Sequence, residues 1–197
     1  MARSSQNFFV VIGLVLGSMV AITVQAQQPD TASKGTFPSL TSETLEKQTV
    51  QLPRDFQGER NLLLIAFERE QQRDIDTWLA KIKRYEDIDK GFRYYEIPTI
   101  AKMNSLMRWF INTGMRHGIP DKKARERTIT LYIDKEPFKK SLQIRDEKKI
   151  YAVVVDRSGN VLWRATGPYD EANGNDLQEF LKKSVAHPMT VPTSPAN

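Results

Sequence analysis

The feature that most constrains the fold is a pair of strand-like segments near the carboxyl end of the chain. Residues 150–155 have the sequence Ile-Tyr-Ala-Val-Val-Val, and residues 161–166 have the sequence Val-Leu-Trp-Arg-Ala-Thr. Between them, Asp156 opens and Gly159 closes a turn of the kind that joins neighbouring antiparallel strands. We therefore predict that these segments form a closing antiparallel hairpin.

Upstream of this hairpin, strand-like and helix-like segments alternate. The run at 61–67 is apolar after its first residue and fits a central strand covered on both faces. In chain order the predicted elements are a short hairpin at 44–52, a strand at 61–67, a helix at 75–85, a strand at 92–97 that stops before Pro98, a helix at 98–117, a strand at 128–133, the hairpin at 150–166 and a helix starting near Asn175. This order predicts an α/β sandwich with a mixed central sheet and helices on both faces.

The two ends of the chain differ from its middle. Residues 8–24 carry no charge and end close to Ala26, which is the layout of a secretory signal peptide over residues 1–26. An uncleaved membrane anchor at 8–24 is the alternative, because the run is near the shortest length that spans a bilayer. We expect a linker at 27–36, one domain at 37–186 and a disordered tail at 187–197. The chain is then exported, to the periplasm if the source is Gram-negative.

Charge is unevenly distributed along the chain. The net charge is +5, and residues 93–149 contain 14 Lys and Arg against 7 Asp and Glu. A basic middle segment indicates an anionic partner or an anionic membrane surface. Nucleic acid is not expected as a partner, because no binding motif is present and export separates the chain from the genome.

The chain contains no cysteine. Thiol–disulfide exchange and cysteine-based peroxide reduction both require a thiolate, so these activities are excluded. No cofactor is expected. No metal site is expected either, because the only two histidines, His117 and His187, belong to no ligand cluster.

Two segments resemble the start of the peroxiredoxin branch of the thioredoxin-like proteins. They are Phe-Pro-Ser-Leu at 37–40 and Leu-Pro-Arg-Asp-Phe-Gln-Gly at 52–58, followed by the apolar strand. The resemblance implies a thioredoxin-like sandwich with its reactive cysteine just after that strand. That position is here occupied by Glu68, Arg69, Glu70, Gln71, Gln72 and Arg73. The proline that the fold places before the strand at Ile150 is replaced by residues 146–149, Asp-Glu-Lys-Lys.

Further segments are similar to the ATP synthase assembly factor ten family, which is cysteine-poor and thioredoxin-like. The similar segments are Tyr95–Ile97, the basic helix ending at Ile119–Pro120, Leu142–Ile144 and residues 151–163. Where members of the family have Trp-Ala-Gly-x-Gly, this chain has Trp-Arg-Ala-Thr-Gly at 163–167. The resemblance implies a chaperone-like role in the assembly of a membrane complex.

The stretch at 68–73 is the first candidate site. A helix start offers free N–H groups to an anion, and Arg69 and Arg73 could hold an anionic substrate there. A purely structural interpretation is that Glu68 and Glu70 suit the positive end of the helix dipole. An enzyme with non-thiol chemistry, or a binder of small anionic ligands, is therefore the alternative function.

The predicted helix at 98–117 is the second candidate site. Its apolar stripe consists of Ile100, Met103, Leu106, Met107, Phe110 and Ile111. Such a stripe either packs in the core or forms a contact surface. Trp109 lies off the stripe beside Arg108, and we predict that Arg108, Trp109 and Arg116 bind a partner or a membrane. The favoured function is an exported, non-catalytic domain that binds a protein partner or a membrane surface.

Overall fold

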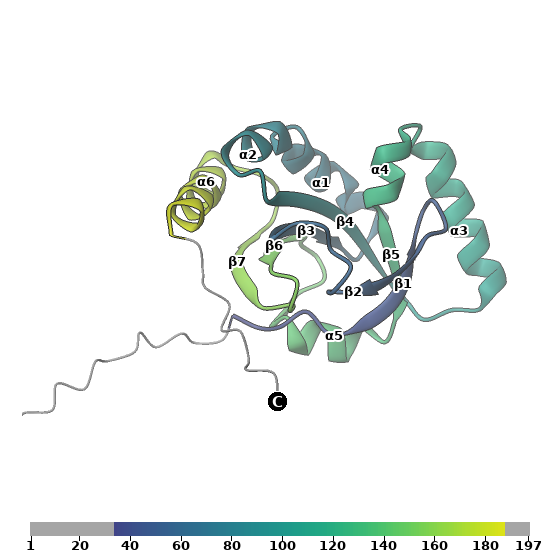
Figure 1. Ribbon diagram of the computed structural model, residues 1–197. Helices are drawn as coiled ribbons and strands as arrows, with labels where there is room; N and C mark the ends of the chain where they lie inside the picture. The colour runs from purple at the N-terminus through teal and green to yellow at the C-terminus, as the bar shows by residue number, and fades with distance from the viewer. Residues whose placement is uncertain (1–33, 188–197) are drawn as a thin grey trace, which may run out of the picture. The chain divides into compact units, whose positions relative to one another are not determined.

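The computed structural model describes residues 34–187, which form one mixed sheet with helices on both faces (Figure 1). Its elements are β1 (Leu40–Thr44), β2 (Thr49–Leu52), β3 (Arg60–Ala66), the 3-10 turn η1 (Arg69–Gln71), α1 (Gln72–Leu79), α2 (Ile82–Ile88), β4 (Phe92–Ala101), α3 (Ser105–Gly118), α4 (Lys122–Arg127), β5 (Ile129–Ile133), α5 (Lys135–Ser141), β6 (Tyr151–Val155), β7 (Val161–Thr166) and α6 (Glu171–Ala186). The predicted α/β sandwich is confirmed.

The strand order in the seven-stranded sheet is β2-β1-β5-β4-β3-β6-β7. Strands β3, β4 and β5 run parallel to one another, whereas β6 pairs antiparallel with β3 and β7 pairs antiparallel with β6 at the edge of the sheet. The predicted closing antiparallel hairpin is confirmed as β6–β7, and it follows the parallel pairing of β3 with β4. The short hairpin β1–β2 extends the opposite edge by pairing antiparallel with β5.

The central strand β3 supplies side chains to two cores. Leu62 and Leu64 lie in the cluster with α1, α2 and α6, whereas Leu63 and Ile65 lie in the cluster with α5. All four side chains are fully buried. A strand that is covered on both faces has no polar side, which explains the unbroken apolar run.

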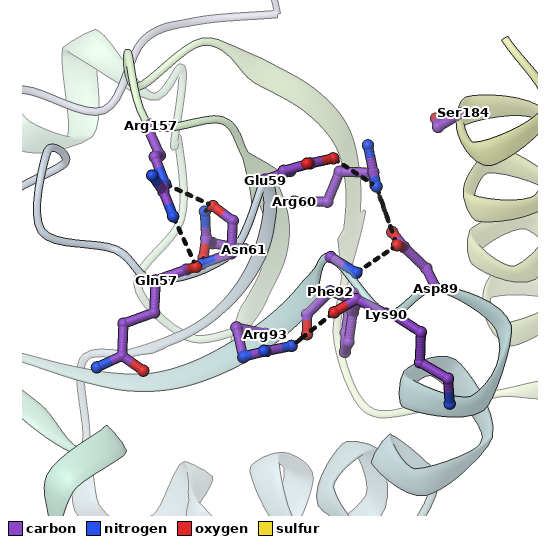
Figure 2. A network of polar contacts seen from close by, with 12 residues as sticks. Gln57, Glu59, Arg60, Asn61, Asp89, Lys90, Phe92, Arg93, Arg157 and Ser184 are labelled. Carbon is purple, nitrogen blue, oxygen red and sulfur yellow. Dashed lines mark hydrogen bonds and ion pairs between the residues drawn. The ribbon is translucent and has the colours of Figure 1, made fainter. Parts of the chain in front are cut away.

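A buried ion pair joins the start of β3 to the turn between α2 and β4 (Figure 2). The carboxylate of Asp89 is 2% exposed, and it accepts two hydrogen bonds from the guanidinium of Arg60 and one from the Gly91 N–H. Burial by itself would raise the pKa of Asp89. The hydrogen bonds from Arg60 and Gly91 and the charge of Arg60 outweigh burial, so the pKa lies below its ordinary value.

The helix predicted at 75–85 is two helices. The first, α1, ends at Leu79, and α2 begins at Ile82. The Lys81 N–H bonds to the carbonyl of Trp78, three residues back, which tightens the last turn of α1. Trp78 and Ile82 are both buried, so the apolar spacing continues across a break in the backbone.

The prediction that a strand ends and a helix begins at Pro98 is wrong. Strand β4 continues to Ala101, and α3 starts only at Ser105. Pro98 has no N–H to donate to a neighbouring strand. It lies opposite Ala66, the last residue of β3, where the pairing of β4 with β3 ends. The strand then continues by pairing with β5 from Thr99 onward.

Three further helix starts differ from prediction, and an aspartate caps each of them. The last helix, α6, begins at Glu171 rather than near Asn175, and Asp170 accepts a hydrogen bond from Asn173 N at 2.7 Å. The helices α4 and α5 were not predicted. Asp121 caps α4 and Asp134 caps α5.

The predicted signal peptide or anchor at 1–26 lies outside the described residues. The same holds for most of the predicted linker, residues 27–33, and for the tail at 188–197. Thr36 already belongs to the fold, because it forms a bridge with Asn160. Among the helices of residues 34–187, none has the length and apolar character needed to cross a bilayer.

Candidate functional site

The stretch at 68–73 lies at the turn from β3 into η1 and α1, as predicted. Its buried member is Gln71, which is 5% exposed. The side-chain oxygen of Gln71 accepts hydrogen bonds from Phe67 N at 2.8 Å and Glu68 N at 3.3 Å. Its side-chain nitrogen donates to the carbonyl of Glu147 at 2.6 Å. Gln71 therefore links the helix start to the loop that precedes β6.

These hydrogen bonds weaken the case for an anion site at 68–73. Glu68 is the N-cap of η1, and the Gln71 side chain already binds the N–H groups of Phe67 and Glu68 beside the helix start, while the Gln71 N–H bonds to the Glu68 carbonyl. The side chains of Arg69 and Arg73 are exposed. Neither forms an ion pair with a carboxylate among residues 34–187, and no structural feature orients them toward a common ligand.

The loop at 146–149 occupies the place of the missing proline and is held from two sides. The carboxylate of Glu147 pairs with Lys135 and, at 2.7 Å, with Lys139. The hydroxyl of Tyr151 donates to the carbonyl of Asp146 at 2.9 Å. These contacts position the Glu147 carbonyl that Gln71 binds, so polar contacts join the turn at 68–73 to the loop at 146–149.

A buried carboxylate lies behind this region. Glu96 on β4 is 6% exposed, and its oxygen accepts a hydrogen bond from the side chain of Gln72 at 3.1 Å. Burial raises the pKa of Glu96, and the charge of Asp76 raises it further against the lowering effect of Gln72. The charged form of Glu96 therefore costs folding free energy.

We expect Glu96→Gln to stabilise the protein at pH 7 by about 1 kcal/mol, because the amide keeps the hydrogen bond without a buried charge. Above the ordinary pKa of 4.5, the folded state retains a proton that the unfolded state loses, so the natural chain loses stability as pH rises. The gain should disappear near pH 4. Urea unfolding at several pH values measures it, and the exposed neighbour Glu70→Gln should show no comparable gain.

The second candidate site, α3, lies at the side of the sheet next to β1 and β5 (Figure 1). Polar contacts attach it. The Tyr132 hydroxyl donates to the side-chain oxygen of Asn112 at 2.7 Å, and Arg116 donates to the carbonyl of Leu45. The guanidinium of Arg108 lies 5.8 Å from the centre of the Tyr132 ring. The side of α3 that faces the sheet is therefore its polar side.

The apolar side of α3 faces away from the protein. No residue of the helix is buried. Its large apolar residues are 71% exposed at Leu106, 48% at Met107, 60% at Trp109 and 68% at Phe110. We call these four residues the α3 face. Of the two interpretations of the apolar stripe, packing in the core is wrong for Leu106, Met107 and Phe110.

The three residues predicted to bind a partner are close together. Arg108, Trp109 and Arg116 all line a hollow of about 430 Å³ between α3 and strands β1 and β5. Arg108 and Arg116 also hold the helix in place, and only Trp109 belongs to the α3 face. Sequence reasoning missed Leu106, Met107 and Phe110 as exposed. In the sequence, the spacing of four between Arg108, Asn112 and Arg116 marks a second, polar face of this helix, but not which face meets the sheet.

No group of three or more metal-ligating side chains occurs within residues 34–187.

Comparison with known proteins shows the fold. No protein-family model matches the chain, and no curated protein matches it. The thioredoxin domain of a thiol-disulfide oxidoreductase from Bacteroides vulgatus has a similar structure, with a TM-score of 0.50, 20% identity, and coverage of 76% of this chain and 98% of that one. A protein from Aquifex aeolicus VF5 proposed to transfer electrons has a TM-score of 0.54, 10% identity and the same coverage. The fold is thioredoxin-like.

Within this thioredoxin-like fold, the turn between β3 and α1 is where the resemblance implies a reactive cysteine. Gln71 stands there with all its side-chain polar atoms bonded within the protein. The chain has no cysteine elsewhere to replace it. A cysteine-dependent redox activity is therefore excluded for this thioredoxin-like chain.

Proposed function

We propose that this chain is a non-catalytic thioredoxin-like domain that works by binding a macromolecular partner through the α3 face. The observation that carries the proposal is the exposure of Leu106, Met107, Trp109 and Phe110 on a helix held by its polar side. Apolar residues scattered over a surface are common, but a contiguous group marks an interaction site. The polar anchors keep this group from turning inward.

The loss of catalysis is inferred from the former active site. Gln71 replaces a reactive group with a structural one, because its side chain bonds to both the helix start and the loop at 146–149. Pseudo-active sites of this kind retain the scaffold while function moves to another surface.

The proposed setting is outside the cytoplasm. The support is the uncharged run at 8–24 followed by Ala26, which is the pattern of an export signal or a membrane anchor. A chaperone-like role of the assembly factor ten type is the finer form of the proposal, and its support is the similarity of segments such as residues 151–163.

A photo-crosslinking residue placed at position 110 in the native cell tests the proposal. We expect adducts to form from Phe110 and not from an equally incorporated probe at Lys182, which is exposed on α6. The expected difference follows from the α3 face being covered in the cell. Equal labelling at both positions, or none at position 110, contradicts the proposal.

A further inference from the structure

The α3 face has a charge environment that indicates what covers it. No Asp or Glu occurs between residues 97 and 120, and the cations of this stretch are Lys102, Arg108 and Arg116. Lys122 and Lys123 follow at the start of α4. Lys102, Arg108, Arg116 and Lys123 pair with no carboxylate among residues 34–187, and Lys122 contacts Glu126 only at 3.7 Å. Exposed lysines therefore flank α3 along the chain, with Lys102 before the helix and Lys122 and Lys123 after it, and Glu46 is the carboxylate whose pKa Arg116 and Lys122 help to lower.

The residue types on the α3 face suit the boundary between lipid and water. Leu106 and Phe110 are one helical turn apart, so they project in the same direction. Trp109 carries an apolar ring with one polar N–H, which favours the headgroup level of a bilayer. A helix with such a face and a basic surround lies in the plane of the interface, with its apolar side chains about 5–10 Å deep.

Charge distinguishes a lipid surface from a second copy of the chain as the partner of the α3 face. Two copies joined through their α3 faces would bring two sets of the lysines at 102, 122 and 123 toward each other, and like charges across an interface oppose association. An anionic lipid surface attracts the same residues, at about 1 kcal/mol for each lysine or arginine near it. The basic surround therefore favours a membrane.

We propose that α3 docks on the surface of an anionic bilayer, with Leu106 and Phe110 below the headgroups and the lysines at 102, 122 and 123 against the lipid phosphates. This inference rests on the proposed function, because it names the partner of the α3 face. It requires no conformational change, since the four apolar side chains are already exposed.

Tryptophan fluorescence tests this docking in the full chain. The chain has three tryptophans, of which Trp78 is 0% and Trp163 5% exposed, whereas Trp109 is 60% exposed. Quenching by lipids with brominated acyl chains therefore reports Trp109 on α3. It does so even if the run at 8–24 binds vesicles by itself. Trp109→Phe verifies the assignment by removing the quenchable emission.

Vesicles of brominated phosphatidylglycerol and phosphatidylcholine are expected to quench Trp109, whereas vesicles of brominated phosphatidylcholine alone are expected to quench it far less. Removing three charges in Lys102→Gln, Lys122→Gln and Lys123→Gln should weaken partitioning of α3 by roughly 100-fold. The pair Leu106→Ser and Phe110→Ser should abolish quenching. A matched triple change at the exposed lysines 148, 149 and 182 should leave it unchanged.

Three results would overturn bilayer docking: no quenching by either vesicle, equal quenching by both, or equal loss in the two lysine triples. A dimer that dissociates when Phe110 is replaced by Ser would instead assign the α3 face to a second copy. If vesicles do not quench Trp109 but the probe at position 110 crosslinks to a protein in the cell, the proposed function stands and only docking on a bilayer is contradicted. If there is neither quenching by vesicles nor crosslinking at position 110, the proposed function is contradicted as well.

Discussion

Asp89→Asn is expected to lower the free energy of unfolding by about 3–5 kcal/mol. The change removes the negative charge from a carboxyl group that is 2% exposed and leaves the guanidinium of Arg60, 11% exposed, without its buried counter-charge. It also weakens the acceptor of the Gly91 N–H, which shapes the turn before β4. Urea unfolding at pH 7 measures the loss.

The control for this change is Asp87→Asn, two residues away. Asp87 pairs with Lys83 at 2.6 Å, but both side chains are more than half exposed, so the loss should be far smaller than at Asp89. The contribution of Asp89 should be present above its unfolded-state pKa and be lost as pH falls toward its lower folded-state pKa. Equal losses of unfolding free energy at positions 87 and 89 would show that the buried pair of Arg60 and Asp89 stabilises the fold no more than an exposed pair does.

Gln71→Ala is expected to destabilise the protein by about 2–4 kcal/mol, the second largest effect. The alanine leaves two backbone N–H groups, at Phe67 and Glu68, and the carbonyl of Glu147 without the partners that they have in the natural protein. Thermal unfolding and urea unfolding both measure this loss. The result would establish that Gln71 holds the turn at 68–73 to the loop at 146–149.

Two further variants test whether the loss comes from the hydrogen bonds of Gln71. Glu70→Ala changes an exposed neighbour and should stay within about 0.5 kcal/mol of the natural protein. Gln71→Glu keeps the acceptor for Phe67 N and Glu68 N but loses the donor to Glu147, so it separates the two halves of the contact. A neutral Gln71→Ala would mean that the loop at 146–149 is held without Gln71.

The fold was largely predictable because its central elements have local signatures. The unbroken apolar run of β3 and the Asp156-to-Gly159 turn between β6 and β7 each require only neighbouring residues to be recognised. Helix caps were also present in the sequence, at Asp121, Asp134 and Asp170, but they were not recognised. Two helices were missed for that reason, and α6 was started too late.

Errors arose where tertiary pairing outweighs a local rule. Pro98 is an unfavourable residue inside a strand, yet β4 continues past it because Thr99 to Ala101 pair with β5. The position of residues 68–73 at the turn between β3 and α1 was predictable from the order of elements. The role of Gln71 was not, because its acceptor, Glu147, lies 76 residues away.

The sequence by itself determined the α/β architecture, the order of its strands, and the absence of sulfur chemistry, because these depend on residue types and local spacing. Only the tertiary structure decided which side of α3 faces the sheet. A helix with apolar residues on one side and Arg108, Asn112 and Arg116 on another can pack with either side inward. Tyr132 and the carbonyl of Leu45 offer hydrogen bonds to the polar side, so the apolar side faces outward.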